Sequence, residues 1–167
     1  WDLALTGIVP TLHVAAPRDG ARLRETLRES IDIKDAPSLV RFPKGAVHSD
    51  IPAFERRDGI DVLYRGESAD VLLVSVGAMA AIAVEAASQA YREGVGVTVI
   101  DLRWVKPLPQ ALVAMAQRYK SVVVLEDGIR HGGIASSISE LFRDAGIVIA
   151  LRSEEHTSEL QSHSFIS

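Results

Sequence analysis

The residues best suited to chemistry in this chain are Arg41 and Lys44, in the segment Arg-Phe-Pro-Lys-Gly that ends at Gly45. Arg41 stands near the end of the apolar run 38–42, which predicts a strand. Open α/β sheets bind ligands beyond the carboxyl ends of their strands. The planar guanidinium of arginine matches a phosphate group, and Lys44 adds a second positive charge. The pattern favours a phosphate site here; the alternative is a surface arginine that caps the strand in an ion pair.

A second candidate for anion binding follows the apolar run 121–125. Glu126-Asp127-Gly128 comes directly after this run, and Gly132-Gly133 precedes a predicted helix. A glycine-rich loop before a helix can bind an anion through backbone N–H groups. However, the acidic pair would repel a phosphate and no G-x-G-x-x-G pattern is present, so a plain turn with an N-capping role is favoured. His131 has the chemistry of a general acid or base, but a single loop histidine is more often solvated.

Other polar residues fit structural roles better than catalytic ones. Asp70 and Asp101 stand next to predicted strands and are typical of turns, and Asp101 and Arg103 are close enough in sequence for a local ion pair. His13 alternates with apolar residues, which favours a core or interface position. No Ser-His-Asp set and no metal-ligand set emerges, so we expect no catalytic residue and no metal site.

Apolar runs alternate with helical patterns along the chain, which predicts an α/β fold with layered helices and strands. The polar stretch 44–58, with the charge cluster Glu55-Arg-Arg-Asp58, is typical of a solvated linker. We therefore expect an α/β unit over residues 1–50, a linker over 51–67 and a second α/β unit over 68–151. Strands are predicted at 12–16, 38–42, 71–76, 97–100, 121–125 and 147–149, and helices at 20–30, 79–93, 109–118 and 134–144.

Composition argues against several kinds of partner. The formal net charge is −4, which provides no electrostatic basis for binding nucleic acid. No apolar run approaches the roughly 20 residues of a membrane-spanning helix, so no membrane association is expected. The chain has no cysteine, which excludes disulfide bonds and cysteine-based metal sites.

The residues at both ends of the chain indicate that it is a fragment of a longer protein. The first residue is Trp1 and no signal peptide follows it. Residues 152–167 resemble the in-frame translation of a sequencing adapter; they are polar and show no helical or strand period. We expect this segment to be non-native and disordered.

Several segments together carry a resemblance to a known group of enzymes. They are Trp1-Asp-Leu3, Gly7-Ile-Val-Pro10, Ala15-Ala-Pro-Arg-Asp19, Val40-Arg-Phe-Pro-Lys-Gly45, Val99-Ile-Asp-Leu-Arg-Trp-Val-Lys-Pro107, and Leu125-Glu-Asp127 with Gly132-Gly133. With them, residues 1–151 resemble the thiamine-diphosphate enzymes of the transketolase group, most closely the 1-deoxy-D-xylulose-5-phosphate synthases. The Ala-Pro-Arg-Asp and Arg-Phe-Pro-Lys-Gly segments are typical of the synthases. The segment ending at Pro107 also occurs in β subunits of 2-oxo acid dehydrogenases, which are the alternative.

The resemblance implies a fold and an activity. Residues 1–50 would be the end of a pyrimidine-binding domain, and residues 68–151 a truncated transketolase C-terminal domain with three αβα layers. The family condenses pyruvate and D-glyceraldehyde 3-phosphate with loss of CO₂, as a cytoplasmic homodimer that uses thiamine diphosphate and Mg²⁺. Its product feeds isoprenoid, thiamine and pyridoxal synthesis.

The resemblance implies that Arg41 binds the phosphate of the aldehyde substrate and that Lys44 contributes weakly to substrate binding. The family's cofactor-activating glutamate, substrate-contacting histidine and diphosphate domain would lie before Trp1. This chain alone is therefore expected to be inactive and to bind no cofactor. A transketolase and a non-catalytic regulatory or assembly domain of the same fold remain further alternatives.

Overall fold

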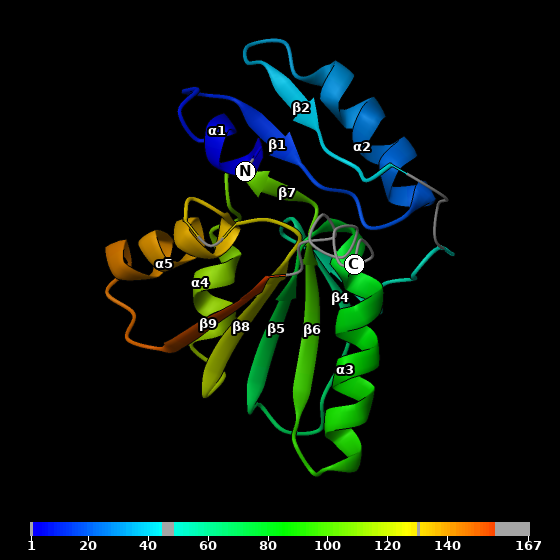
Figure 1. Cartoon of the computed structure of the whole chain (residues 1–167), viewed down its shortest axis with the longest axis vertical. Helices are drawn as coiled ribbons and strands as arrows, with labels where there is room; N and C mark the ends of the chain where they lie inside the picture. The colour runs from blue at the N-terminus through cyan, green and yellow to red at the C-terminus, as the bar shows by residue number, and fades with distance from the viewer. Residues whose placement is uncertain (1, 45–48, 130, 156–167) are drawn as a thin grey trace, which may run out of the picture.

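The computed structural model describes residues 2–44, 49–129 and 131–155 of the chain. Within them the strands form two sheets, a three-stranded sheet in the order β2-β1-β7 and a six-stranded sheet in the order β3-β4-β6-β5-β8-β9 (Figure 1). Helices and strands alternate along most of the chain, so the predicted α/β class is confirmed. None of the described helices is long and apolar enough to cross a membrane.

The N-terminal part consists of α1 (Asp2–Thr6), β1 (His13–Ala15), α2 (Gly20–Asp32) and β2 (Ser38–Val40). The predicted strand–helix–strand pattern is confirmed: β1 and β2 are parallel, and α2 connects them. Asp19 begins α2, because its side chain accepts a hydrogen bond from the backbone N–H of Arg22 at 2.7 Å.

The third strand of this sheet comes from the distant segment β7 (Trp104–Lys106). It runs antiparallel to β1, with Val14 opposite Lys106 and Ala15 opposite Trp104. No strand was predicted from the sequence at residues 104–106. Because of β7, the N-terminal sheet is completed by the C-terminal part of the chain.

The six-stranded sheet is built around three parallel strands, β5 (Val71–Ser75), β6 (Val97–Leu102) and β8 (Ser121–Glu126). Alternate residues of β5 face opposite sides. Leu73 packs in a cluster with the alanines of α3 (Ala80–Arg92), which follows the short helix η1 (Gly77–Met79). Leu72 packs on the other side, in a cluster with α4 (Ala111–Ala116) and α5 (Ile134–Asp144). The predicted three-layer αβα arrangement is confirmed.

The predicted linker is wrong over most of its length. Residues 55–57 form β3 (Glu55–Arg57) and residues 60–64 form β4 (Ile60–Tyr64), an antiparallel pair at one edge of the large sheet. β4 pairs with β6, and its first four residues are buried. The charges that indicated a solvated linker belong to the exposed edge strand β3, which explains why composition alone was misleading.

The predicted disorder of residues 152–167 is wrong for the first four of them. β9 (Ala150–Glu155) runs parallel to β8, with Arg152 opposite Val123 and Glu155 opposite Glu126. Backbone pairing with a neighbouring strand needs no apolar side chains, so the polar composition did not reveal it. Residues 156–167 lie outside the described residues, and the foreign origin of the segment stays a prediction.

Candidate phosphate-binding site

Arg41 lies at the carboxyl end of β2, as the sequence predicted. Its backbone N–H donates to the carbonyl of Ala15 at 2.8 Å, which continues the parallel pairing of β1 and β2 by one residue. Its side chain reaches the loop after β8, where Nη2 donates to the backbone carbonyl of Asp127 at 2.9 Å. The same nitrogen lies 3.7 Å from Oδ2 of Asp127, and both side chains are about a quarter exposed.

The two interpretations offered for Arg41 from sequence are thus not exclusive. The residue does form an ion pair, but with Asp127 of the other sheet rather than with a neighbour in sequence. Its guanidinium remains at the surface, at the edge where ligands meet open α/β sheets. Lys44 lies three residues further along, in an exposed bend; Gly45, the last residue of the segment, lies outside the described residues.

The loop after β8 carries an internal anion, the carboxylate of Glu126. This side chain is fully buried, and its two oxygens accept hydrogen bonds from the first backbone N–H groups of α5, at Ile134 (2.8 Å) and Ala135 (2.9 Å). The predicted N-capping role of this loop is confirmed. Negative charge is favourable at a helix N-terminus, and here the protein itself supplies it.

The two loop glycines have steric explanations. A Cβ at Gly133 would lie 2.5 Å from the carbonyl oxygen of Ile129 and within 2.8 Å of both Glu126 oxygens. Gly132 has φ +76°, and a Cβ there would lie 2.9 Å from the side chain of Ala4 in α1. His131 is exposed, as predicted for a solvated loop histidine, and Arg130 lies outside the described residues.

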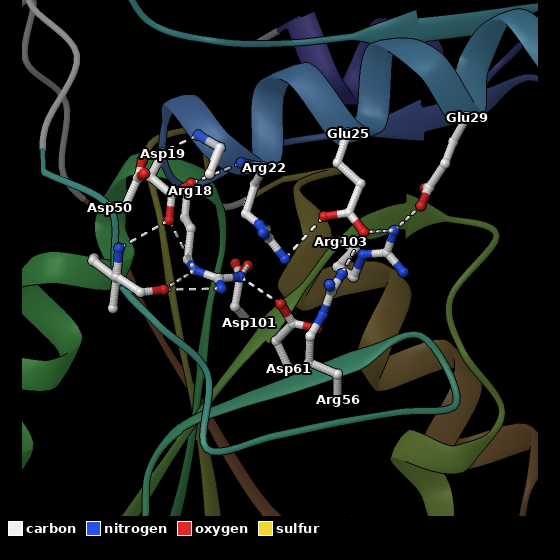
Figure 2. A network of polar contacts seen from close by, with 12 residues as sticks. Arg18, Asp19, Arg22, Glu25, Glu29, Asp50, Arg56, Asp61, Asp101 and Arg103 are labelled. Carbon is white, nitrogen blue, oxygen red and sulfur yellow. Dashed lines mark hydrogen bonds and ion pairs between the residues drawn. The ribbon is translucent and has the colours of Figure 1, made fainter.

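A second set of charges, which we term the junction network, joins the two sheets (Figure 2). Its centre is Arg18, between β1 and α2. Arg18 Nη1 donates to Oδ2 of Asp61 in β4 at 2.8 Å and to Oδ2 of Asp101 in β6 at 2.7 Å. Arg18 Nε also lies 3.3 Å from Asp19, and all four side chains are only 1% exposed. A single guanidinium therefore faces three buried carboxylates.

The network continues to the surface through α2 and the segment before β7. Arg56 bridges Asp61 (3.1 Å) and Glu25 (2.7 Å). Glu25 also pairs with Arg103, and Arg103 with Glu29. The predicted local pair of Asp101 and Arg103 is wrong, because each of the two side chains finds its partners in distant segments of the chain instead.

Burial and charge shift the pKa values of Asp101 and Arg18, at the buried centre of the junction network. Burial raises the pKa of Asp101 to about 7; the charge and hydrogen bond of Arg18 oppose this, and the charges of Asp61 and Asp19 add to it. Burial would lower the pKa of Arg18, but its ion pairs with Asp101 and Asp61 outweigh that effect and raise it. One oxygen of Asp101, Oδ1, is buried without a hydrogen-bond partner in the described part of the chain.

From sequence, Asp101 was expected only as a turn residue or a local partner of Arg103. Arg18 and Asp19 were named only within the segment Ala15-Ala-Pro-Arg-Asp19 that carries the resemblance. The one signal for burial was the apolar surroundings of each, Ala15-Ala-Pro17 before Arg18 and Val97–Ile100 before Asp101. Asp70, by contrast, has the predicted turn role. Its carboxylate pairs with Lys120 at 2.6 Å and accepts hydrogen bonds from Ser68, two residues earlier, and from the backbone N–H of Gly96 at 3.0 Å. These contacts lower its pKa.

Comparison with known proteins agrees with this architecture. Residues 61–152 match the family model described as transketolase, C-terminal domain. The chain belongs to the transketolase C-terminal domain family. The matched residues begin in β4 and end in β9, so this transketolase C-terminal domain comprises most of the six-stranded sheet.

Two relatives that match most of the chain have the same name. The 1-deoxy-D-xylulose-5-phosphate synthase of Mycolicibacterium gilvum is 53% identical over 155 residues, covering 91% of this chain and 24% of the relative. That of Paenarthrobacter aurescens is 48% identical over 156 residues, with 90% and 24% covered. The chain thus spans about a quarter of the length of these relatives. The resemblance to the synthases is confirmed.

Solved structures match the transketolase C-terminal domain and the N-terminal sheet together. A split-gene transketolase, solved as an inactive β4 tetramer, has a TM-score of 0.81 and 28% identity, covering 96% of this chain and 54% of the other. A transketolase from Campylobacter jejuni, at 17% identity, has a TM-score of 0.68, covering 93% of this chain and 23% of the other. The second similarity concerns the fold alone.

Proposed function

We propose that this chain belongs to a 1-deoxy-D-xylulose-5-phosphate synthase, in which Arg41 binds the phosphate of D-glyceraldehyde 3-phosphate. That enzyme condenses the aldehyde with pyruvate and releases CO₂. The names of the relatives at about 50% identity support the reaction. From the resemblance we also infer a cytoplasmic homodimer whose product enters isoprenoid, thiamine and pyridoxal synthesis.

The position of Arg41 is the observation that carries the proposal. The residue lies beyond the carboxyl end of β2, partly exposed, with Nη2 held by the carbonyl of Asp127. An anchored guanidinium presents its N–H groups in a defined direction, which suits the bidentate binding of a phosphate. Lys44, in the exposed bend that follows, adds positive charge to the same edge.

The described residues do not fit the cofactors that the family implies, thiamine diphosphate and Mg²⁺. No group of three or more histidines, aspartates or glutamates in the described part of the chain is placed to hold a metal ion. The N–H groups that begin α5, which would suit a diphosphate, already bind Glu126. We therefore assign Arg41 and Lys44 the binding and orientation of the aldehyde, and we assign no described residue a step at the cofactor.

The 167-residue chain by itself should not catalyse the reaction. It spans about a quarter of the relatives' length, and thiamine chemistry needs protein groups that orient and activate the cofactor. The β4 tetramer of the split-gene transketolase is likewise inactive, which supports the same expectation here. That similarity also makes a transketolase the second candidate, although its identity of 28% is well below that of the synthases.

A chimaeric enzyme tests the proposal. In it, the aligned residues of this chain replace their counterparts in the Mycolicibacterium gilvum synthase. We expect pyruvate and D-glyceraldehyde 3-phosphate to be converted to the sugar phosphate and CO₂ at a rate within about tenfold of the parent. A chimaera that folds and binds thiamine diphosphate but forms no sugar phosphate would contradict the proposal.

A further inference from the structure

The contact between Arg41 and Asp127 places a negative charge beside the proposed phosphate site. Two parts of Asp127 face the guanidinium: the carbonyl, which accepts a hydrogen bond at 2.9 Å, and the carboxylate, whose Oδ2 lies 3.7 Å from Nη2. The first contact orients Arg41 and adds no net charge. The second offsets part of the charge of Arg41 at the place where an anion would bind.

The position of Asp127 is constrained by its neighbour. Glu126 is fully buried and holds both its oxygens on the first turn of α5, and Gly133 packs against that carboxylate. The backbone of Asp127 directly follows this anchored residue. This fixes the backbone of Asp127 beside Arg41, and with the carboxylate where the structure has it, 3.7 Å from the guanidinium, an incoming anion experiences both charges.

We propose that Asp127 sets the affinity of the Arg41 site: its carboxylate weakens anion binding, so that a phosphate group alone binds poorly and the rest of the substrate must contribute. This inference rests on the proposed function of Arg41. The effect of a fixed charge grows with the charge of the ligand. Removal of the carboxylate should therefore strengthen binding of phosphate more than binding of a monoanion such as formate.

The substitution Asp127→Asn removes the charge and keeps the backbone carbonyl that orients Arg41. We expect it to tighten binding of inorganic phosphate roughly two- to tenfold at low ionic strength, the scale of an interaction between partly exposed charges. The matched control is Asp144→Asn, which removes the same charge at the exposed opposite end of α5 and should leave the affinity unchanged. Damage to the fold would weaken phosphate binding, whereas removal of the charge should strengthen it. The direction of the change in affinity therefore separates the two explanations.

The experiment measures the affinity of the 167-residue chain for inorganic phosphate and for formate, by titration followed in NMR spectra, with thermal melts to show that each variant is folded. Tighter phosphate binding by Asp127→Asn, with no change for Asp144→Asn, supports the inference. If Arg41→Ala abolishes binding but Asp127→Asn binds phosphate no more tightly than the wild type, the inference about Asp127 is overturned. The role of Arg41 then remains intact. Absence of phosphate binding even by Asp127→Asn also overturns the inference. Phosphate binding that Arg41→Ala does not reduce overturns the Arg41 site itself.

Discussion

Arg18 and Asp101, which are 83 residues apart in sequence, meet at 2.7 Å in a buried ion pair that ties the N-terminal sheet to the six-stranded sheet. The same Nη1 atom also binds Asp61. Taking three carboxylates and one guanidinium out of water is costly, and only their mutual contacts offset that cost. Arg18 therefore holds together a set of buried charges at the junction between the two sheets.

Arg18→Met should lower the free energy of unfolding by roughly 3–5 kcal/mol, because it leaves buried carboxylates without their cation. Urea-induced unfolding of the 167-residue chain measures this. Arg57→Met is the control: the Arg57 side chain is 78% exposed and pairs with its neighbour Asp58 at 3.0 Å, so its loss should stay below about 1 kcal/mol. Similar losses for the two variants would show that the junction network contributes little.

The raised pKa of Asp101 predicts how stability depends on pH. The ordinary pKa is 3.8 and the folded value is about 7, so between these values the folded protein keeps a proton that the unfolded chain has released. Unfolding then releases a proton, and stability from this group falls as the pH rises from about 4 to 7. Asp101→Asn should remove this part of the slope. An advantage of the wild type over Asp101→Asn that grows with pH would contradict the assignment.

The buried position of the Glu126 carboxylate predicts a steric effect of substitution at Gly133 and none at Gly128. Gly133→Ala places a Cβ against the Ile129 carbonyl and the Glu126 carboxylate and should cost roughly 1–3 kcal/mol. Gly128→Ala is the matched control, because its Cβ would meet Glu126 only at 3.4 Å, an ordinary contact. Thermal unfolding compares the two variants, and equal melting temperatures would show that the loop adapts freely.

The pairing of β9 predicts where the chain can be shortened. A chain that ends at Leu151 loses four of the six residue pairs with β8 and should be less stable than one that ends at Glu155 by roughly 1–3 kcal/mol. Chains that end at Glu155 and at Ser167 should have equal stability, because the remaining segment has no apolar period with which to pack. A clear loss on removing residues 156–167 would disprove the second expectation.

Local features were predictable from sequence, and contacts between distant segments were not. The apolar runs before Arg41 and Glu126 marked strands, because each signal lies within a few neighbouring residues. Nothing local indicates that Arg18 meets Asp61 and Asp101. The sequence predicted Arg41 as a ligand residue, yet its partner Asp127 is 86 residues away.

β3 and β9 were missed because backbone pairing overrides composition. β3 carries three charged residues and still forms an edge strand, since β4 offers it hydrogen-bonding groups. β9 continues into polar residues for the same reason, beside β8. Tertiary context decides such short segments more strongly than their own propensities.

The phosphate role of Arg41 is tested most directly in the chimaeric synthase by comparing phosphorylated and unphosphorylated D-glyceraldehyde. Arg41→Ala should lower kcat/KM for the phosphorylated aldehyde at least about tenfold, the loss of a charge-assisted contact worth about 1.5–3 kcal/mol. It should leave kcat/KM for the unphosphorylated aldehyde and the KM for pyruvate nearly unchanged, and Arg41→Lys should restore activity only in part. Equal losses for the two aldehydes would contradict a phosphate site at Arg41.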